Sequence, residues 1–138
     1  MTHPPSSTLS APLEALLFTP APPGIGPEIR VGRDDLNSLD DRLAGFFAAT
    51  GLPTGSEPLI RCAVLLWHDH LDPAHELAQE IANPSGSWLH GIMHRREPDY
   101  WNAKYWFQRV GNHPAAASLS HLAGALLAMP GHAALKTR

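Results

Sequence analysis

The chain has 138 residues and a formal net charge of −3, with 43% apolar and 17% charged residues. This length fits one domain with one core, and this composition is typical of a soluble globular protein rather than a disordered, collagen-like or disulfide-rich chain. Cys62 is the single cysteine, so neither an intramolecular disulfide nor a cysteine-based zinc cluster can form. Apolar runs such as residues 63–67 are far too short for a membrane helix, and the first residues carry no secretory pattern. We therefore expect a cytoplasmic protein.

Proline marks the N-terminal quarter of the chain. Residues 1–12 are rich in Pro and Ser, and residues 19–33 are rich in Pro and Gly, which predicts irregular or extended backbone. Between them, residues 10–18 predict a short helix with Ser10 as its cap.

A clearer helix follows, capped by Asp34 or Asp35 and ended by Gly51 and Pro53. Its apolar residues fall on one stripe of a 3.6-residue period: Leu36, Leu39, Leu43, Phe46 and Phe47. We divide the chain here into a Pro-rich segment, residues 1–33, and a single all-helical domain, residues 34–138.

The rest of the chain keeps the helical period, and the breaks between helices contain proline. The predicted helices are 58–71, 73–82, 86–96, 98–110 and 117–129. Proline near a helix start costs nothing because the first backbone N–H groups have no partner in the helix. No segment alternates as a strand does, so the predicted fold is all-α, built of short antiparallel helical hairpins.

Charge and histidine are unevenly distributed. Residues 1–85 contain four arginines and eleven acids, whereas residues 86–138 contain six basic residues and two acids. The opposite charges favour packing of the two halves on each other. Six of the nine histidines and all four tryptophans lie between residues 67 and 113. This clustering indicates a site in that region.

Small and aromatic residues recur in residues 91–110 at a spacing typical of a helical repeat. Gly91 is followed by Ala103, Phe107 and Val110, and Pro114 comes after the helix. Residues 62–81 repeat the pattern partly, 29 residues earlier. Residues 58–129 thus resemble the tetratricopeptide repeat, which implies stacked helical hairpins that cross closely at Gly91.

The segment His-Gly-Ile-Met-His-Arg-Arg-Glu, residues 90–97, is a second recognisable feature. Together with residues 67–70 and 98–107, it resembles a signature of a family of small bacterial and fungal proteins without an established activity. The resemblance contributes a signature and implies no function.

Two histidines and an acid fall on one face of the helix predicted at residues 86–96. His90, His94 and Glu97 form a single stripe, a spacing that can bind zinc, iron, manganese or another divalent transition metal. A further ligand is expected from the preceding hairpin, where His68 is favoured over the alternatives Asp69, His70, Asp72 and His75. Two alternatives to a metal site remain open, a metal-free polar pocket and a set of structural histidines. A buried imidazole ring is tolerated without a metal when its nitrogens have hydrogen-bond partners.

Basic and aromatic residues near this stripe indicate a second kind of contact. Arg95 and Arg96 point away from the histidine stripe and are predicted to bind an anion, unless they pair with acids. Lys104, Tyr105 and Arg109 extend the predicted ligand-binding surface. The expected ligand is a small anion or a peptide carboxylate.

Three functions are compatible with these patterns. The favoured one is a small ligand-binding domain with a polar site rich in His and Arg. The second is a metal-dependent enzyme, hydrolytic or oxidative, with Asp69, His70 or Glu97 as candidate catalytic residues. The third is a protein–protein adaptor with a basic groove. The net negative charge argues against nucleic acid, and the sequence does not determine the oligomeric state.

Overall fold

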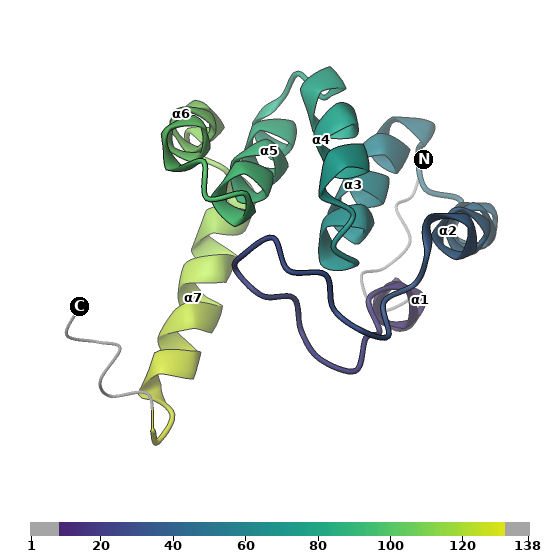
Figure 1. The fold of residues 1–138 in the computed structure, drawn as a ribbon, viewed down its shortest axis with the longest axis horizontal. Coiled ribbons are helices and arrows are strands. Elements are labelled where there is room, and N and C mark those ends of the chain that lie inside the picture. The colour runs from purple at the N-terminus through teal and green to yellow at the C-terminus, as the bar shows by residue number, and fades with distance from the viewer. Residues whose placement is uncertain (1–8, 132–138) are drawn as a thin grey trace.

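A computed structural model describes residues 9–131. In this part of the chain it contains seven α-helices and no strand, so the predicted all-α class is confirmed (Figure 1). The helices are α1 (Ser10–Leu16), α2 (Leu36–Thr50), α3 (Glu57–Trp67), α4 (Leu71–Glu80), α5 (Pro84–Arg96), α6 (Tyr100–Val110) and α7 (Pro114–Ala128), and a 3₁₀ turn, η2 (Thr54–Ser56), precedes α3.

The ends of α2 follow from its cap residues. The Asp35 side chain accepts a hydrogen bond from the Ser38 N–H at 3.0 Å and so satisfies a free donor of the first turn. Gly51 ends the helix in the left-handed region at φ 60°, with its N–H donating to the Phe47 carbonyl. The predicted start and end of this helix are confirmed.

The core lies between α1, α2, α3, α4 and α5. Its buried residues are Leu16, Leu39, Leu43, Phe46, Cys62, Val64, Leu65, Leu66, Ala74, Ala78 and Met93. Small residues on α4 allow it to approach α3, and the Cys62 thiol donates to the Ala74 carbonyl at 3.3 Å. Burial raises the pKa of Cys62 to about 12, so this thiol packs as a small apolar group and is unreactive.

The turn between α3 and α4 differs from the sequence prediction. The predicted helix 58–71 ends at Trp67, because Asp69 adopts the left-handed conformation at φ 62° and reverses the chain. The His70 N–H donates back to the Leu65 carbonyl at 2.9 Å and closes the turn. Residues 68–70 therefore lie in a turn, not on a helix face.

α5 and α6 pack closely at Gly91. A Cβ atom placed at this glycine would lie 2.7 Å from two ring atoms of Phe107. Only a residue without a side chain permits this approach. The expected close crossing at Gly91 is confirmed, and it brings the side chains of α6 against those of α5.

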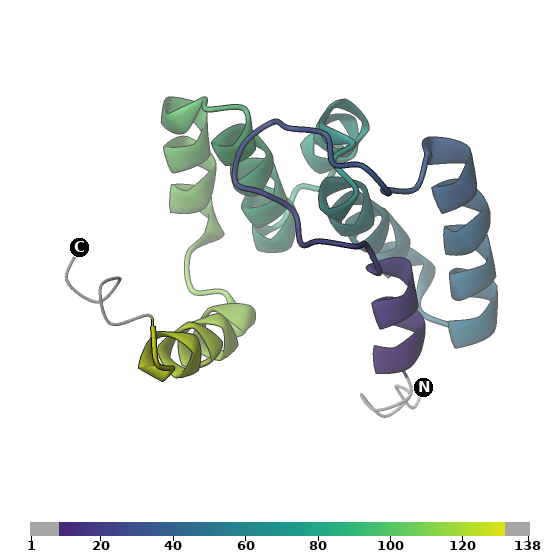
Figure 2. The same cartoon turned by 60° about the horizontal axis from the view of Figure 1, so that its bottom comes forward.

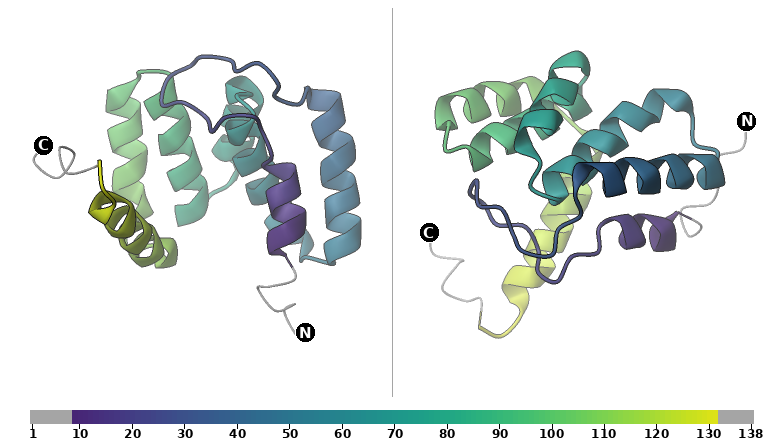
Figure 3. Two further views of the ribbon diagram at one scale, coloured as in Figure 1. Left: turned by 90° about the horizontal axis from the view of Figure 1, so that it is seen from below. Right: turned by 45° about the vertical axis from the view of Figure 1, so that its right-hand side comes forward.

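The segment between α1 and α2 crosses the ends of α3 and α5 (Figure 2, Figure 3). It is held by Asp69, whose carboxylate pairs with Arg30 at 2.9 Å and with Arg96 at 2.7 Å. Arg96 also donates to the Gly26 carbonyl at 3.0 Å and to the Leu66 carbonyl at 2.6 Å. This buried network fixes the N-terminal segment on the helical body.

α7 extends from the body beyond α6 and buries none of its residues (Figure 1). Leu119 and Leu122 are each more than half exposed. Within residues 9–131, no helix combines the length and the apolar character that crossing a membrane would require.

Candidate functional site

Three histidines meet where α4 packs on α5. His90 and His94 lie one turn apart on α5, and His75 faces them from α4. One potential ligand atom from each ring lies within 4.8 Å of the other two. We call His75, His90 and His94 the histidine triad.

The rings of the triad form a compact aromatic cluster. The His90 and His94 rings stack with centroids 4.9 Å apart, and His75 meets them edge-on at 4.7 Å and 5.0 Å. Trp106 of α6 covers the other side of His90, with centroids 3.9 Å apart and planes inclined by 17°. The close approach of α6 at Gly91 thus places an indole over His90 and helps to bury that ring.

The triad contains buried nitrogen atoms without hydrogen bonds. His90 is 2% exposed and His94 is 7% exposed. Both ring nitrogens of His90 and the Nδ1 atom of His94 lack a hydrogen-bond partner among the described residues. Each unsatisfied buried group costs about 1–3 kcal/mol, so these atoms destabilise the fold unless something binds them.

Electrostatics keeps His90 neutral. Burial lowers its pKa to about 4, and repulsion from His75 and His94 contributes to the shift. A histidine ligates a metal through a neutral imidazole nitrogen. His90 is therefore in its ligating form at neutral pH.

Two carboxylates lie at the edge of the triad. The Glu97 oxygen is 3.4 Å from His94 Nδ1, and the Asp99 oxygen is 3.8 Å away. Both fall within ion-pair reach of the ring, although neither makes a well-oriented hydrogen bond with it. Glu97 lies just past the end of α5 and is one-third exposed. A carboxylate beside a ligating histidine orients the ring and raises its basicity.

His68, the favoured additional ligand, is not part of the triad. Its Nδ1 accepts a hydrogen bond from the Asp34 N–H at 3.2 Å, and its Nε2 lies 2.7 Å from the Leu16 carbonyl. Both nitrogens are thus satisfied, and the ring ties α1 and the start of α2 to α3. His75 takes the position expected for His68. Because the chain turns at Asp69, the helix that faces His90 begins later in the sequence and carries His75.

Asp69 and His70 also have structural partners. Burial alone raises the Asp69 pKa, but the hydrogen bonds from Arg30 and Arg96 outweigh burial and lower it overall. The His70 Nε2 lies 2.8 Å from the Asp34 carbonyl, and burial lowers its pKa. The two candidate catalytic residues of the turn therefore hold the N-terminal segment in place.

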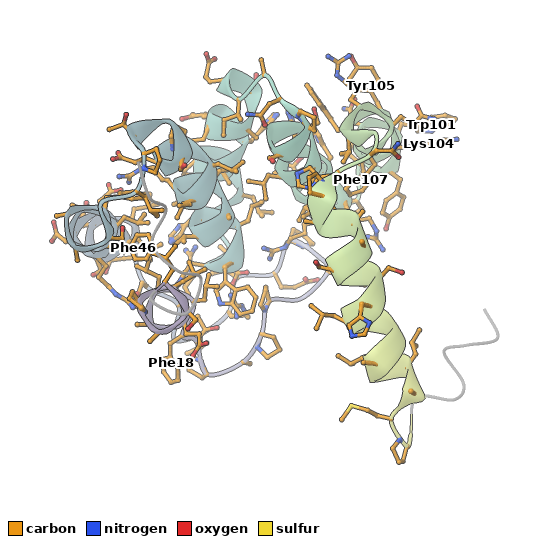
Figure 4. All side chains as sticks on the ribbon, turned by 180° about the vertical axis from the view of Figure 1, so that it is seen from behind. Phe18, Phe46, Trp101, Lys104, Tyr105 and Phe107 are labelled. Carbon is orange, nitrogen blue, oxygen red and sulfur yellow. The ribbon has the colours of Figure 1, made fainter. Side chains whose placement is uncertain are left out.

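The predicted anion-binding residues separate into three environments. Arg96 is 5% exposed and is engaged with Asp69, which excludes it from a surface anion site. Arg95 lies over the Tyr100 ring and lines a shallow groove together with Lys104. Arg109 lies on another side of α6, above the rings of Tyr105 and Trp106. Figure 4 shows Tyr105 and Lys104 projecting outward from α6.

Comparison of the chain with protein-family models, with curated proteins and with solved structures finds no match. The resemblances to the tetratricopeptide repeat and to the bacterial and fungal family therefore stay predictions.

One feature of the sequence could have identified the third histidine, although the sequence analysis favoured His68. His75 lies on the helix that immediately precedes α5, and two antiparallel helices joined by a short loop face each other. What the sequence did not show was the left-handed turn at Asp69, which decides whether residues 68–70 or residue 75 faces His90.

Proposed function

We propose that this protein binds one divalent transition-metal ion through His75, His90 and His94. The observation that carries the proposal is the set of buried ring nitrogens of His90 and His94 without hydrogen-bond partners. A bound cation would satisfy one nitrogen of each ring, whereas a purely structural histidine would be expected to have a carbonyl or carboxylate partner, as His68 does.

The donor set favours zinc. Imidazole nitrogens suit zinc, copper, iron and nickel, whereas manganese prefers oxygen ligands. Zinc bound to histidine has metal–nitrogen distances of about 2.0–2.1 Å, which places two ligand nitrogens roughly 3.3 Å apart in a tetrahedral site. The triad nitrogens lie within 4.8 Å of one another, so small ring movements bring them to that spacing.

The number of ligands supports a second candidate, the metal-dependent enzyme. Three histidines leave one position of a tetrahedral ion for water or a substrate, as in catalytic zinc sites. Glu97, 3.4 Å from His94 and one-third exposed, is the available carboxylate for proton transfer at such a site. The protein–protein adaptor has less support, because Arg96 of its basic groove is engaged with Asp69.

The proposal is tested by metal analysis of tag-free protein that has never contacted a metal column. We expect about one zinc ion per chain, both as purified and after titration of the stripped protein with zinc in the presence of a competing chromogenic chelator. His75→Ala, His90→Ala and His94→Ala are each expected to weaken binding at least tenfold.

His121→Ala is the matched control, because His121 lies on the exposed helix α7, away from the triad. This variant should bind zinc as the wild type does. Equal zinc binding by His90→Ala and His121→Ala, or no binding by folded wild type, would overturn the proposal.

A further inference from the structure

A groove of about 550 Å³ lies beside the triad, where the loop joining α4 and α5 approaches α6. Ile81 and Trp106 form apolar parts of its wall, and Gln79, Asn83, Ser87 and Arg109 contribute polar groups. None of the described residues that line the groove is acidic. This volume is within the range of sites that hold small organic molecules.

Arg109 is the cation of this groove. Its guanidinium lies 5.5 Å from the Tyr105 ring centroid and 5.6 Å from that of Trp106, and it donates weakly to the Tyr105 hydroxyl at 3.4 Å. In the described part of the chain, no carboxylate lies within ion-pair distance of it. Arg109 is thus positioned by aromatic rings and keeps its charge available for an anion.

Ser87 supplies a second polar group to the groove. Its side chain lines the groove, and none of the described residues forms a hydrogen bond with its hydroxyl, which solvent reaches although the residue is only 8% exposed. The hydroxyl is therefore free to bind a ligand in the groove. The neighbouring start of α5, at Asn83 and Pro84, adds the partial positive charge of a helix N-terminus.

We propose that this groove binds a small organic anion, a carboxylate or a phosphate monoester with an apolar portion. The acid group contacts the Arg109 guanidinium and the Ser87 hydroxyl, and the apolar portion packs on Trp106 and Ile81. The absence of acidic residues in the wall leaves this positive charge uncompensated. The site requires no metal, so this proposal is tested independently of zinc binding.

The test is a titration of ¹⁵N-labelled, metal-free protein with phenyl phosphate and, separately, with benzoate, followed by backbone and indole NMR signals. We expect saturable shifts at Gln79, Asn83, Ser87 and the Trp106 indole N–H. The probe that binds more tightly identifies the acid group. Inorganic phosphate should bind more weakly than phenyl phosphate, because it lacks the apolar portion.

Two variants decide whether the groove is the binding site. Arg109→Gln should weaken binding about tenfold or more, since it removes a charge-assisted hydrogen bond, and Ser87→Ala should weaken it by a smaller factor. Arg95→Gln is the matched control, because Arg95 is also an exposed arginine over an aromatic ring, in a different groove.

Binding that is lost in Arg109→Gln and retained in Arg95→Gln supports the proposal. No saturable shifts with either probe, or equal weakening by the two arginine substitutions in proteins with well-dispersed spectra, would overturn it.

Discussion

At the scale of single residues, His68 and His90 are both almost fully buried, but they differ in what their nitrogens contact. The two nitrogens of His68 have partners in the N-terminal segment, at Asp34 and Leu16. Those of His90 have none among the described residues. Residue type and burial are the same in the two cases, so the hydrogen-bond partners are what distinguish a structural histidine from a candidate ligand.

The depressed pKa of His90 makes a prediction for stability. The folded protein has a His90 pKa of about 4, whereas an unfolded chain has one of about 6.5. As the pH falls, the unfolded state therefore binds this proton before the folded state does. The free energy of unfolding is unaffected by His90 above about pH 6.5, and it decreases as the pH falls toward 4. With screening by nearby water, we expect a loss on the order of 1–2 kcal/mol in the free energy of unfolding of metal-free protein.

Urea denaturation of the wild type and His90→Leu at several pH values between 7 and 4 measures this loss. The variant should have a shallower pH dependence than the wild type in this window. Parallel curves for the two proteins would contradict a depressed pKa for His90 in the folded state.

Replacing both histidines of α5 separates a binding role from a structural one. His90→Leu with His94→Leu removes the orphaned polar atoms and keeps side chains of similar size. Because burying unpaired nitrogens is costly, we expect the double variant to be at least as stable as the metal-free wild type while losing zinc binding. Thermal unfolding with and without zinc measures both effects, and an unfolded double variant would instead support a structural role.

At the scale of elements, the turn between α3 and α4 organises the N-terminal segment. Asp69 stands in the left-handed region and contacts both Arg30 and Arg96. Asparagine tolerates the same backbone conformation but carries no charge. Replacing Asp69 with Asn therefore measures how much the negative charge contributes to stability, because the turn stays intact.

We expect Asp69→Asn to lower the free energy of unfolding by about 2–4 kcal/mol, since it leaves the buried Arg96 guanidinium without its counter-charge. Chemical denaturation measures the change. Asp40→Asn is the control, because the Asp40 pair with Arg61 is exposed and should contribute less than about 1 kcal/mol. Equal effects of the two substitutions would show that the Asp69 network does not hold the segment.

At the scale of the whole molecule, the sequence predicted the all-α class because the apolar periodicity, the caps at Asp35 and Gly51 and the prolines at helix starts all agree. It also predicted the close approach at Gly91. These features are local, and local signals survive in a single sequence.

The site was less accessible from the sequence, since its composition depends on contacts between distant segments. His90 and His94 were identified by their spacing within one helix, whereas His75 was one of several alternatives. Arg96 was predicted to bind an anion unless it paired with an acid. The sequence did not show which acid, because its partners Asp69 and Gly26 lie 27 and 70 residues away. The orphaned nitrogens could be seen only once the helices were packed.

The distribution of the core gives a prediction for the whole molecule. Leu43 on α2 is fully buried, whereas Leu122 on α7 is 63% exposed. Leu43→Ala should lower the free energy of unfolding by about 2–5 kcal/mol, and Leu122→Ala by less than about 0.5 kcal/mol. Urea denaturation of both variants measures the difference, and a comparable loss in the two would show that α7 is buried in solution.

Metal binding at the histidine triad is tested most sharply by a crystal structure of zinc-loaded protein, with anomalous diffraction measured on both sides of the zinc absorption edge. We expect one anomalous peak, from a zinc ion that lies about 2.0–2.1 Å from one ring nitrogen each of His75, His90 and His94. A zinc ion bound at other residues, or an empty triad in zinc-soaked crystals, would contradict the proposed site.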